Sequence, residues 1–550
     1  MVKVKQPSVY NVIILFSFLG TLAISPWVNK DSMIIPKLLL LFICASYLLP
    51  KIVYSIPEIQ KFNKIKLLLV ISTLITIHVA VVAIISRAPF EQQLFGRTGR
   101  GLGIITALSL LSVMLASAIF VRREKIQLLL SALVVSCLIS SVYSIFQSFG
   151  IDFLKWDSKT NGVIGTLGNP NFQSSFAAMA LIPTAILFWN LKYRYIGSVF
   201  FSGLLIWVIF RTQSTQGFVS AAVAILMFAI AISYQRYKPI SFLLCILLFT
   251  SGVVAILGML NKGPLNSYLY KVSVQSRGDF WRSAFATANE HPFFGVGIDS
   301  FGDSYLKYRD QIAINHPWAE YADNAHNFFL EYAATAGYPM VILHLSLIML
   351  TLLSYIQAYR KIERFDVNLL ALFISWSVFQ LQSVISPGNL SMMMWNSILS
   401  GTLIGISVVI TSNLEELVPT KKQVLTKTRI YSFSCVVASF LIIYPLYNAD
   451  HQQMKAMNTA NGDLAISAAK QYPESVLRYQ VITRELLNSN LPIQALDLAR
   501  SAVKFNPNSA SLWALIVINP TAPISERVEA KNKILKLDPL NKEVIDYVVK

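Results

Sequence analysis

The chain has 550 residues, of which 55% are hydrophobic and only 13% are charged, and its mean hydropathy is +0.56. This composition excludes an ordinary soluble globular protein and is typical of an integral membrane protein. The formal net charge is +18, but the basic residues gather in short loops between apolar runs, so membrane topology explains the charge better than nucleic-acid binding. The four cysteines lie inside apolar runs without C-x-x-C or Cys/His ligand spacing, which supports neither a disulfide framework nor a zinc site.

Apolar runs predict about thirteen membrane-spanning helices, because a bilayer core needs roughly 20 apolar residues. The first run follows MVKVK without a clear cleavage site, and we interpret it as a span and not as a signal peptide. The predicted fold class is therefore all-α, a polytopic membrane protein. The predicted spans are 11–28, 33–54, 66–86, 102–121, 126–148, 172–191, 195–211, 217–234, 239–260, 338–358, 367–386, 391–412 and 429–447.

Basic loops predict the orientation of these spans. Seven Lys/Arg-rich segments, from MVKVK at the N-terminus to KKQVLTKTR at 421–429, fall on one side of the membrane if the N-terminus is cytoplasmic. This orientation puts the polar loop 262–337 on the outer side. We therefore expect a transmembrane domain at 1–448, which includes this loop, and an external domain at 449–550.

The external tail carries a weak repeat. A Lys-x-x-Pro pattern ends at Pro473, Pro507 and Pro539, with spacings of 34 and 32 residues. A period near 34 in which Pro closes a helix pair is typical of tetratricopeptide repeats, although the usual aromatic and glycine positions are mostly absent here. We expect a helical-repeat domain that offers a groove to a protein partner, with an irregular helical tail as the alternative.

The polar loop contains the pattern SRGDFWR. Ser276 suits an N-cap and Asp279 follows three residues later, which predicts a helix that begins at Ser276. Arg277 would lie in its first turn, where the helix dipole disfavours a cation unless an anion is bound. Trp281 lies one turn further on the same face. The alternative is an interfacial helix in which Arg277 and Trp281 anchor among lipid headgroups.

A histidine follows later in the same loop. Asp323 or Asn324 is predicted to cap a helix that ends at Gly337, with His326 in its first turn. Histidine is the ordinary general base near neutral pH, and it can take the proton of an attacking hydroxyl. The alternative is a structural histidine bonded to a backbone carbonyl. The other two histidines of the loop form no ligand spacing with His326, so we expect no metal.

Arginines on the predicted outer side form a third feature, because positive charge is under-represented there. Guanidinium groups bind phosphate bidentately, so these arginines suit a diphosphate, unless they pair with carboxylates or lie among headgroups. Lys37 lies inside a predicted span, where a charge is costly and indicates a site. The outer arginines are Arg87, Arg97, Arg100, Arg211, Arg277 and Arg282.

Five segments together resemble the O-antigen ligase and related polymerase superfamily of bacterial envelope enzymes, over roughly residues 10–412. These are FGRTGRGLG (95–103), GTLGNPNF (165–172), RTQSTQG (211–217), RGDFWRSAF followed by HPFFGVGIDSF (277–301), and AHNFFLEYAATAGYPM (325–340). The resemblance implies a fold similar to the C-type membrane glycosyltransferases. It also implies transfer of a glycan from an undecaprenyl diphosphate carrier to an acceptor outside the cytoplasmic membrane, without a cofactor or a required metal.

The resemblance further implies that His326 is the catalytic residue and that Arg277 and Arg211 bind the donor diphosphate. The family often has Ser-Arg-Gly after the span that ends near Arg211, whereas this chain has RTQSTQG. Gln213 or Gln216 is therefore an alternative at this place. To the donor-binding group we add Arg97, Arg100 and Lys37, and as candidates for orienting sugars Trp281, Tyr321, Asn324 and Asn327.

These inferences predict an oligosaccharide transferase of the bacterial cytoplasmic (inner) membrane, surrounded by membrane lipid, with lipid A-core, another glycan or a protein as acceptor and no nucleic-acid partner. A polysaccharide polymerase or a protein O-oligosaccharyltransferase would use the same donor chemistry with another acceptor. A transporter of lipid-linked glycans is the alternative from another class. Inverted symmetry and broken spans would favour it, but the sequence has neither, and the outer loop is longer than a transporter needs.

Overall fold

The computed structural model describes residues 8–154, 156, 162–189, 193–317, 321–362, 364–418, 422–459 and 461–549. Within these residues the protein contains helices and no strand. Ten helices are long and apolar enough to cross a membrane, and α1, α5 and α15 are shorter apolar helices. Each predicted span coincides with one of these thirteen, so the predicted fold class is confirmed. They are α1 (Val9–Leu22), α2 (Ile34–Ile59), α3 (Asn63–Ile85), α5 (Ile104–Phe120), α6 (Ile126–Ser148), α7 (Pro170–Trp189), α8 (Arg194–Arg211), α9 (Thr215–Arg236), α10 (Lys238–Met259), α14 (Phe328–Lys361), α15 (Val367–Ser383), α16 (Leu390–Thr411) and α17 (Lys422–Thr459).

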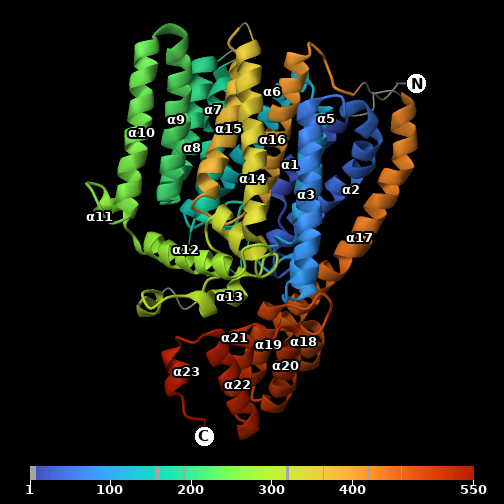
Figure 1. The fold of residues 1–550 in the computed structure, drawn as a ribbon, viewed down its shortest axis with the longest axis vertical. Helices are drawn as coiled ribbons and strands as arrows, with labels where there is room; N and C mark the ends of the chain where they lie inside the picture. Colours follow the sequence, from blue (N-terminus) through green and yellow to red (C-terminus); the bar gives the residue numbers. More distant parts are fainter. Residues whose placement is uncertain are drawn as a thin grey trace.

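The centre of the bundle is formed by α7 and α16, which are the most deeply buried of the long helices. α16 packs closely on α5 because its glycines leave room for the neighbouring backbone. A Cβ atom on Gly401 or Gly405 would lie 2.1 Å from the carbonyl oxygen of Met114 or Ala118, respectively. Such close packing of small residues is common between membrane helices. α10 lies at the edge of the bundle, where it packs mainly on α9 (Figure 1).

Shorter helices cover one end of the bundle. α12 (Val272–Glu290) and α13 (Phe301–Tyr308) lie across this end, and the C-terminal helices lie beyond them (Figure 1). The connections between α9 and α10, between α14 and α15, and before α17 lie at the opposite end. The described parts of the basic loops and the tail are thus at opposite ends, as the predicted orientation requires, whereas MVKVK lies outside the described residues. Which end lies outside the cell stays a prediction. The remaining short elements of the described chain are α4 (Phe90–Phe95), η1 (Arg123–Lys125), α11 (Asn266–Leu269) and η2 (Ala313–Asn315), and η1 belongs to the basic loop between α5 and α6.

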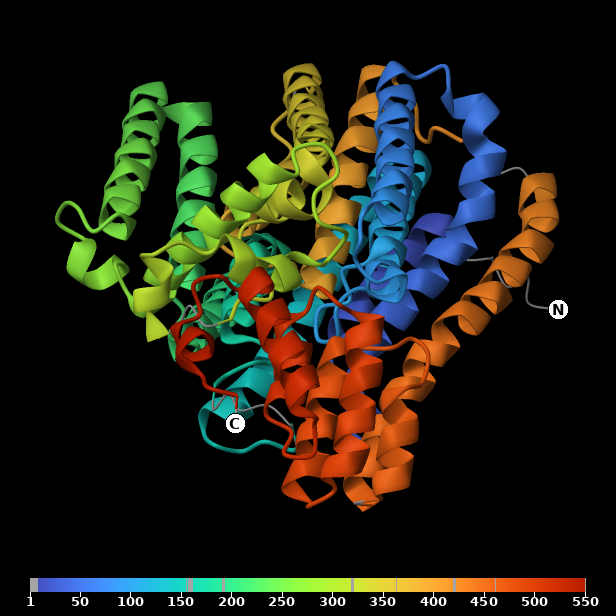
Figure 2. The same cartoon turned by 60° about the horizontal axis from the view of Figure 1, so that its bottom comes forward.

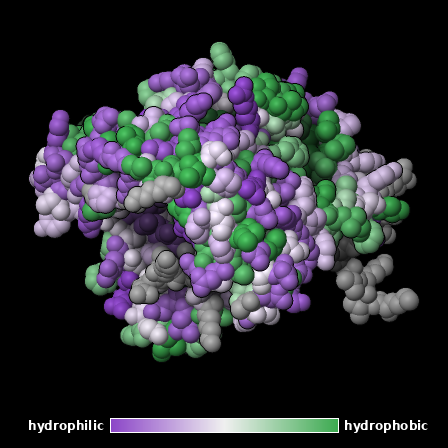
Figure 3. Space-filling view, turned by 90° about the horizontal axis from the view of Figure 1, so that it is seen from below, coloured by the Kyte–Doolittle hydropathy of each residue, from purple (hydrophilic) through white to green (hydrophobic). Residues whose placement is uncertain are grey.

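The tail has an apolar core of its own, built from side chains between 469 and 534. Its helices pack on their neighbours along the chain, and Figure 2 shows them side by side. Seen from the tail end, the surface is mostly hydrophilic with scattered hydrophobic residues (Figure 3). α17 runs without a break across the predicted domain boundary at 448, and the tetratricopeptide assignment stays a prediction. The tail helices are α18 (Gly462–Ala469), α19 (Val476–Asn488), α20 (Pro492–Phe505), α21 (Ala510–Val517), α22 (Ile524–Leu537) and α23 (Lys542–Asp546).

Candidate active site

The helix that carries Arg277 begins one turn earlier than the sequence predicts. α12 starts at Val272, so Ser276 lies inside the helix and the predicted N-cap is wrong. Asp279 does not cap a helix end, because its carboxylate accepts a hydrogen bond from Arg282 at 2.6 Å. Arg277 therefore lies in the second turn, where the dipole of the helix N-terminus is no argument for a bound anion.

Arg277 and Trp281 nevertheless bury polar atoms without partners. The Nε of Arg277 and the indole Nε1 of Trp281 are buried and have no hydrogen-bond partner in the described part of the chain. The Nη1 of Arg277 donates to the carbonyl of Ser273 at 2.9 Å. Burial lowers the pKa of Arg277, and no carboxylate of the described residues offsets this cost. A half-buried arginine that has a buried, unpartnered Nε and no acidic partner among the described residues suits an anionic ligand, since buried polar groups are normally paired.

His326 lies just before α14 and not in its first turn. The N-cap is Asn327, whose side-chain oxygen accepts hydrogen bonds from two amides of the first turn, so the predicted caps Asp323 and Asn324 are wrong. Asn324 instead holds the loop, because its Oδ1 accepts a hydrogen bond from the amide of His326 at 2.7 Å. His326 has a φ of 53°, a left-handed conformation that costs a non-glycine residue about 1 kcal/mol and is often found at functional sites.

The imidazole of His326 is placed to act as a base. Its ring lies against Phe280 of α12, with centroids 5.6 Å apart. Burial, and then the charges of Arg100 and Arg277, lower the pKa of His326 to about 4, which Asp323 offsets only in part. The imidazole is therefore neutral near pH 7 and can accept a proton.

The described part of the chain also contains histidines of the structural kind. His78 shares a hydrogen bond with the carbonyl of Ala336 at 2.7 Å, and His451 with that of Val28 at 2.7 Å. Among the described residues, no backbone carbonyl pairs with the ring of His326 in this way. His326 therefore differs from these two histidines in its contacts, and its catalytic role stays a prediction.

The loop between α4 and α5 brings two further arginines to the site, but both are paired. Arg100 donates two hydrogen bonds to Asp323, at 2.6 and 3.0 Å, and Arg97 lies 3.3 Å from Asp303. Burial alone would lower the pKa of both guanidinium groups, but these carboxylates raise the pKa above its ordinary value. Both arginines thus stabilise the loop, and donor binding by them stays a prediction.

The sequence did not reveal the carboxylates of this site. Asp299 is buried, and its Oδ2 accepts hydrogen bonds from the amides of Arg97 at 2.7 Å and Leu102 at 3.2 Å. Burial raises the pKa of Asp299 to about 6, although the amide of Arg97 counteracts it. Tyr321 is half exposed, and the guanidinium of Arg97 lies over its ring at 5.6 Å.

Two predicted donor-binding residues lie apart from this group. Arg211 ends α8, where it donates to the carbonyl of Ser148 at 2.6 Å. Lys37 is buried in α2, and its ammonium group donates to the carbonyl of Thr166. Gln216, the alternative to Arg211, bonds to serines at 3.0 and 3.3 Å inside the bundle. None of the three contacts His326 or Arg277 within the described residues.

The Gly-x-Gly turn at 295–297 supports α14 at a kink in that helix. α14 kinks at Gly337, which has a φ of 77° and a ψ of 172°. The kink frees the carbonyls of Ala334 and Thr335, and amides of the turn donate to them at 2.9 and 3.0 Å. A Cβ atom on Gly295 would lie 2.2 Å from the Thr335 backbone. The turn therefore holds the first half of α14, which follows His326, against the end of α12.

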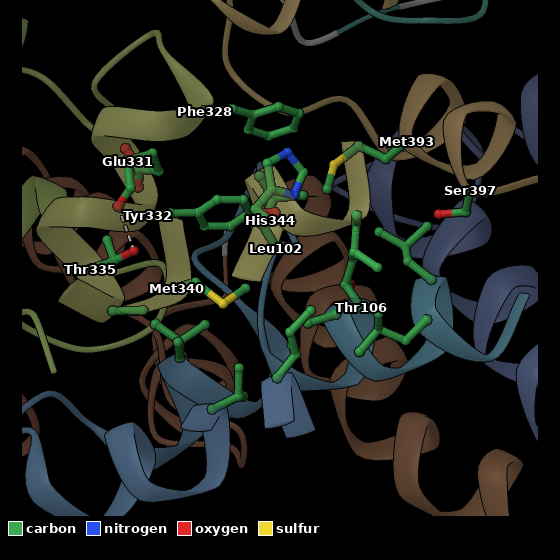
Figure 4. A pocket seen from close by; sticks show the side chains of 18 of the residues that line it. Leu102, Thr106, Phe328, Glu331, Tyr332, Thr335, Met340, His344, Met393 and Ser397 are labelled. Atoms are coloured by element: carbon green, nitrogen blue, oxygen red, sulfur yellow. Dashed lines mark hydrogen bonds between the residues drawn. The ribbon is translucent and has the colours of Figure 1, made fainter. Parts of the chain in front are cut away.

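An apolar cavity of about 110 Å³ lies next to this site, between α3, α5, α14 and α16. In Figure 4 the rings of Phe328 and Tyr332 flank His344 on its wall. The cavity adjoins the loop that carries His326 through Glu331, which lines it and accepts a hydrogen bond from the amide of Ala325 at 2.8 Å. Such a cavity suits a short apolar segment of a ligand. Within the described residues, no group of three or more His, Cys, Asp and Glu side chains could hold a metal ion.

The fold and the site together define a multi-pass membrane protein with a neutral histidine beside an unpaired arginine. Residues 200–345, from α8 into α14, match the protein-family model described as O-antigen ligase. This match confirms the resemblance to the O-antigen ligase-related superfamily and supports a membrane glycosyltransferase-type role. The matched segment contains Arg211, Arg277, Trp281 and His326. A search of curated proteins finds no match.

Proposed function

We propose that this protein transfers a glycan from an undecaprenyl diphosphate carrier to a hydroxyl acceptor at the outer face of the bacterial cytoplasmic membrane. The observation that carries the proposal is that His326, which burial keeps neutral, lies close enough to Arg277 to feel its charge, and that the Nε of Arg277 is buried without a partner. One group can accept a proton and the other can bind a diphosphate. Both side chains lie in the family match, which supports the same chemistry.

The reaction needs little beyond these two groups. The acceptor oxygen attacks the anomeric carbon of the donor sugar, and the bond from that carbon to the diphosphate oxygen breaks. The acceptor proton passes to a ring nitrogen of His326, and undecaprenyl diphosphate leaves with the electron pair of the broken bond. Arg277 stabilises the charge that develops on the leaving diphosphate. Because diphosphate is already a good leaving group, a base and a cationic clamp are chemically sufficient.

Other residues have supporting roles in this proposal. The unpartnered indole Nε1 of Trp281, one turn from Arg277, is available to donate to the diphosphate or to a sugar hydroxyl. Asn324 and Asn327 orient His326, since their side chains already bond to the loop backbone. Tyr321 is exposed enough to contact a sugar. The apolar cavity beside Glu331 would take the first isoprene units of the carrier.

A transfer assay tests the proposal. The purified protein would be given an undecaprenyl diphosphate-linked glycan together with lipid A-core, a glycan or a protein as acceptor, with and without a chelator. We expect a glycosylated acceptor and free undecaprenyl diphosphate, at a rate that the chelator does not change. Movement of the intact lipid-linked glycan without a new glycosidic bond would mean a transporter, and loss of transfer on chelation would mean that a metal takes part.

A further inference from the structure

A second cleft lies where the tail meets the loop helices. It has a volume of about 590 Å³ and is formed by the end of α3, the segment 291–296, α13, the connection between α20 and α21, and the end of α22. This volume lies in the range that holds small ligands in proteins, roughly 300–1,000 Å³. It is distinct from the apolar cavity beside Glu331, because polar and charged side chains line much of its wall.

The charged groups of the cleft leave a positive surplus. Arg87 and Lys307 both line it and are exposed, and neither has a carboxylate partner among the described residues. The carboxylate of Asp303 also lines the cleft, but it is engaged by Arg97 at 3.3 Å. Two cations without an acidic partner at one cleft indicate a ligand that carries an anionic group.

The remaining wall suits a sugar. Phe293, which is 66% exposed, presents an aromatic ring to the cleft. Asn508 contributes a side-chain amide, which donates a hydrogen bond to the backbone carbonyl of Arg87 at 3.2 Å. Tyr308 adds a hydroxyl that pairs with His291 at 3.1 Å. An aromatic ring can cover the C–H face of a sugar while amides and hydroxyls pair with its hydroxyl groups, and a site of this kind fixes orientation through a few polar contacts.

Asp303 connects the cleft to the candidate active site. Its Oδ1 accepts from Arg97 of the arginine loop at 3.3 Å, and its Oδ2 accepts from Asn506 of the tail at 3.0 Å. Gln92 donates to the same Oδ2 at 3.0 Å. One carboxylate thus lies at the border of both sites, so a ligand in the cleft would lie beside the loop that carries Arg97.

We propose that this cleft binds the acceptor, and that the acceptor is a saccharide with an anionic substituent such as a carboxylate or a phosphate. The inference rests on the proposed function and adds to it the chemical class of the acceptor. The headgroup of an anionic lipid offers the same chemistry, a negative group beside hydroxyls, and the experiment separates the two sources.

The test measures saccharide binding to the full-length protein in nanodiscs, without donor. The probes are a tetrasaccharide that contains glucuronic acid and the same tetrasaccharide with its carboxylates reduced to alcohols. We expect the acidic probe to bind about tenfold more tightly than the reduced one. Lys307→Ala and Arg87→Ala should each weaken binding of the acidic probe about fivefold, the effect of one exposed ion pair, and Phe293→Ala should weaken both probes. Lys271→Ala and Phe285→Ala change exposed residues outside the cleft and should change neither.

Several results would overturn the proposal. These are no saturable binding of the acidic probe, equal binding of the two probes, and unchanged binding in both cation variants. The acidic probe could also bind in phosphatidylcholine nanodiscs but lose this binding when phosphatidylglycerol is added. That result would assign the cleft to lipid headgroups. His326→Ala should bind the acidic probe as the wild type does but transfer glycan roughly 10²–10⁴-fold more slowly, so a failure of the cleft and a failure of the transferase proposal give different results.

Discussion

Two segments bring arginines to the candidate active site, and they use the charge differently. In the loop between α4 and α5, Arg97 and Arg100 are paired with Asp303 and Asp323. In α12, Arg277 is half-buried with its Nε out of contact with solvent, and the described chain offers it no carboxylate. A paired cation has its charge neutralised and positions its surroundings, whereas an unpaired buried cation is costly unless a ligand binds it. Whether an arginine has a carboxylate partner thus indicates its function better than its position in the sequence does.

The largest expected effect concerns His326, the proposed base. His326→Ala should lower the turnover of glycan transfer roughly 10²–10⁴-fold, the usual contribution of a general base. Donor affinity should change little, since the imidazole is neutral. The matched control is His451→Ala, which removes a histidine bonded to a backbone carbonyl. Full transfer by the His326→Ala protein would remove this residue from the mechanism.

The second prediction concerns the paired segment. Asp303→Ala leaves the charge of Arg97 buried without its carboxylate and should destabilise the fold by about 3–5 kcal/mol, the cost of breaking a buried ion pair. Asp323→Asn should cost less, because the carboxylate of Asp323 is 35% exposed. Thermal unfolding of the two variants measures the difference. If Asp303→Ala were fully stable and bound donor more tightly, Arg97 would be a ligand-binding residue. The distinction between paired and unpaired arginines would then be wrong.

A third prediction concerns pH. Because burial and the two neighbouring arginines lower the pKa of His326 to about 4, the acid limb of kcat/KM should lie near pH 4 and not near 6.5. The limb of kcat should lie at higher pH, since a bound diphosphate stabilises the imidazolium. Arg277→Gln should also move the limb of kcat/KM upward by removing one positive charge. A limb of kcat/KM at pH 6.5 in the wild type would mean that His326 is solvated and not buried.

The same group affects stability in a defined direction. A histidine whose pKa is lowered on folding binds its proton more readily in the unfolded chain. Between pH 6.5 and about 4 the unfolded state therefore holds more protons, and stability falls as the pH falls through this window. His326→Ala should weaken this dependence.

The spans could be predicted from the sequence because hydropathy is a local property, and all thirteen coincide with helices. The pairings could not, because Arg97 and Asp303 are 206 residues apart, and Arg100 and Asp323 are 223 apart. Only the fold brings them together. The predicted helix starts were wrong for a more local reason. Ser276 and Asn324 are good caps in isolation, but Ser276 lies inside a helix that begins earlier, and Asn324 lies in a tight loop.

The tail gives a similar lesson. Composition predicts a separate domain at 449–550, but the described tail contacts the loops around the site. The hydroxyls of Ser475 and Thr98 lie 2.7 Å apart, and Asp538 accepts two hydrogen bonds at 2.8 Å from Arg309. Deletion of the tail would therefore remove contacts of the arginine loop as well as the wall of the cleft. Point variants of the cleft separate these effects better than truncation.

The contrast between the two arginine segments is tested most directly by donor affinity. Binding of the undecaprenyl diphosphate-linked glycan would be measured for the wild type, Arg277→Ala, Arg277→Lys and the double variant Arg100→Gln/Asp323→Asn, which removes a pair without changing net charge. We predict that Arg277→Ala weakens binding about 10–100-fold, the effect of losing charged hydrogen bonds. Arg277→Lys should recover only part of this loss, because Lys keeps the charge but cannot donate bidentately. The double variant should bind donor within about twofold of wild type. Wild-type affinity in Arg277→Ala, with strong loss in the double variant, would contradict the account.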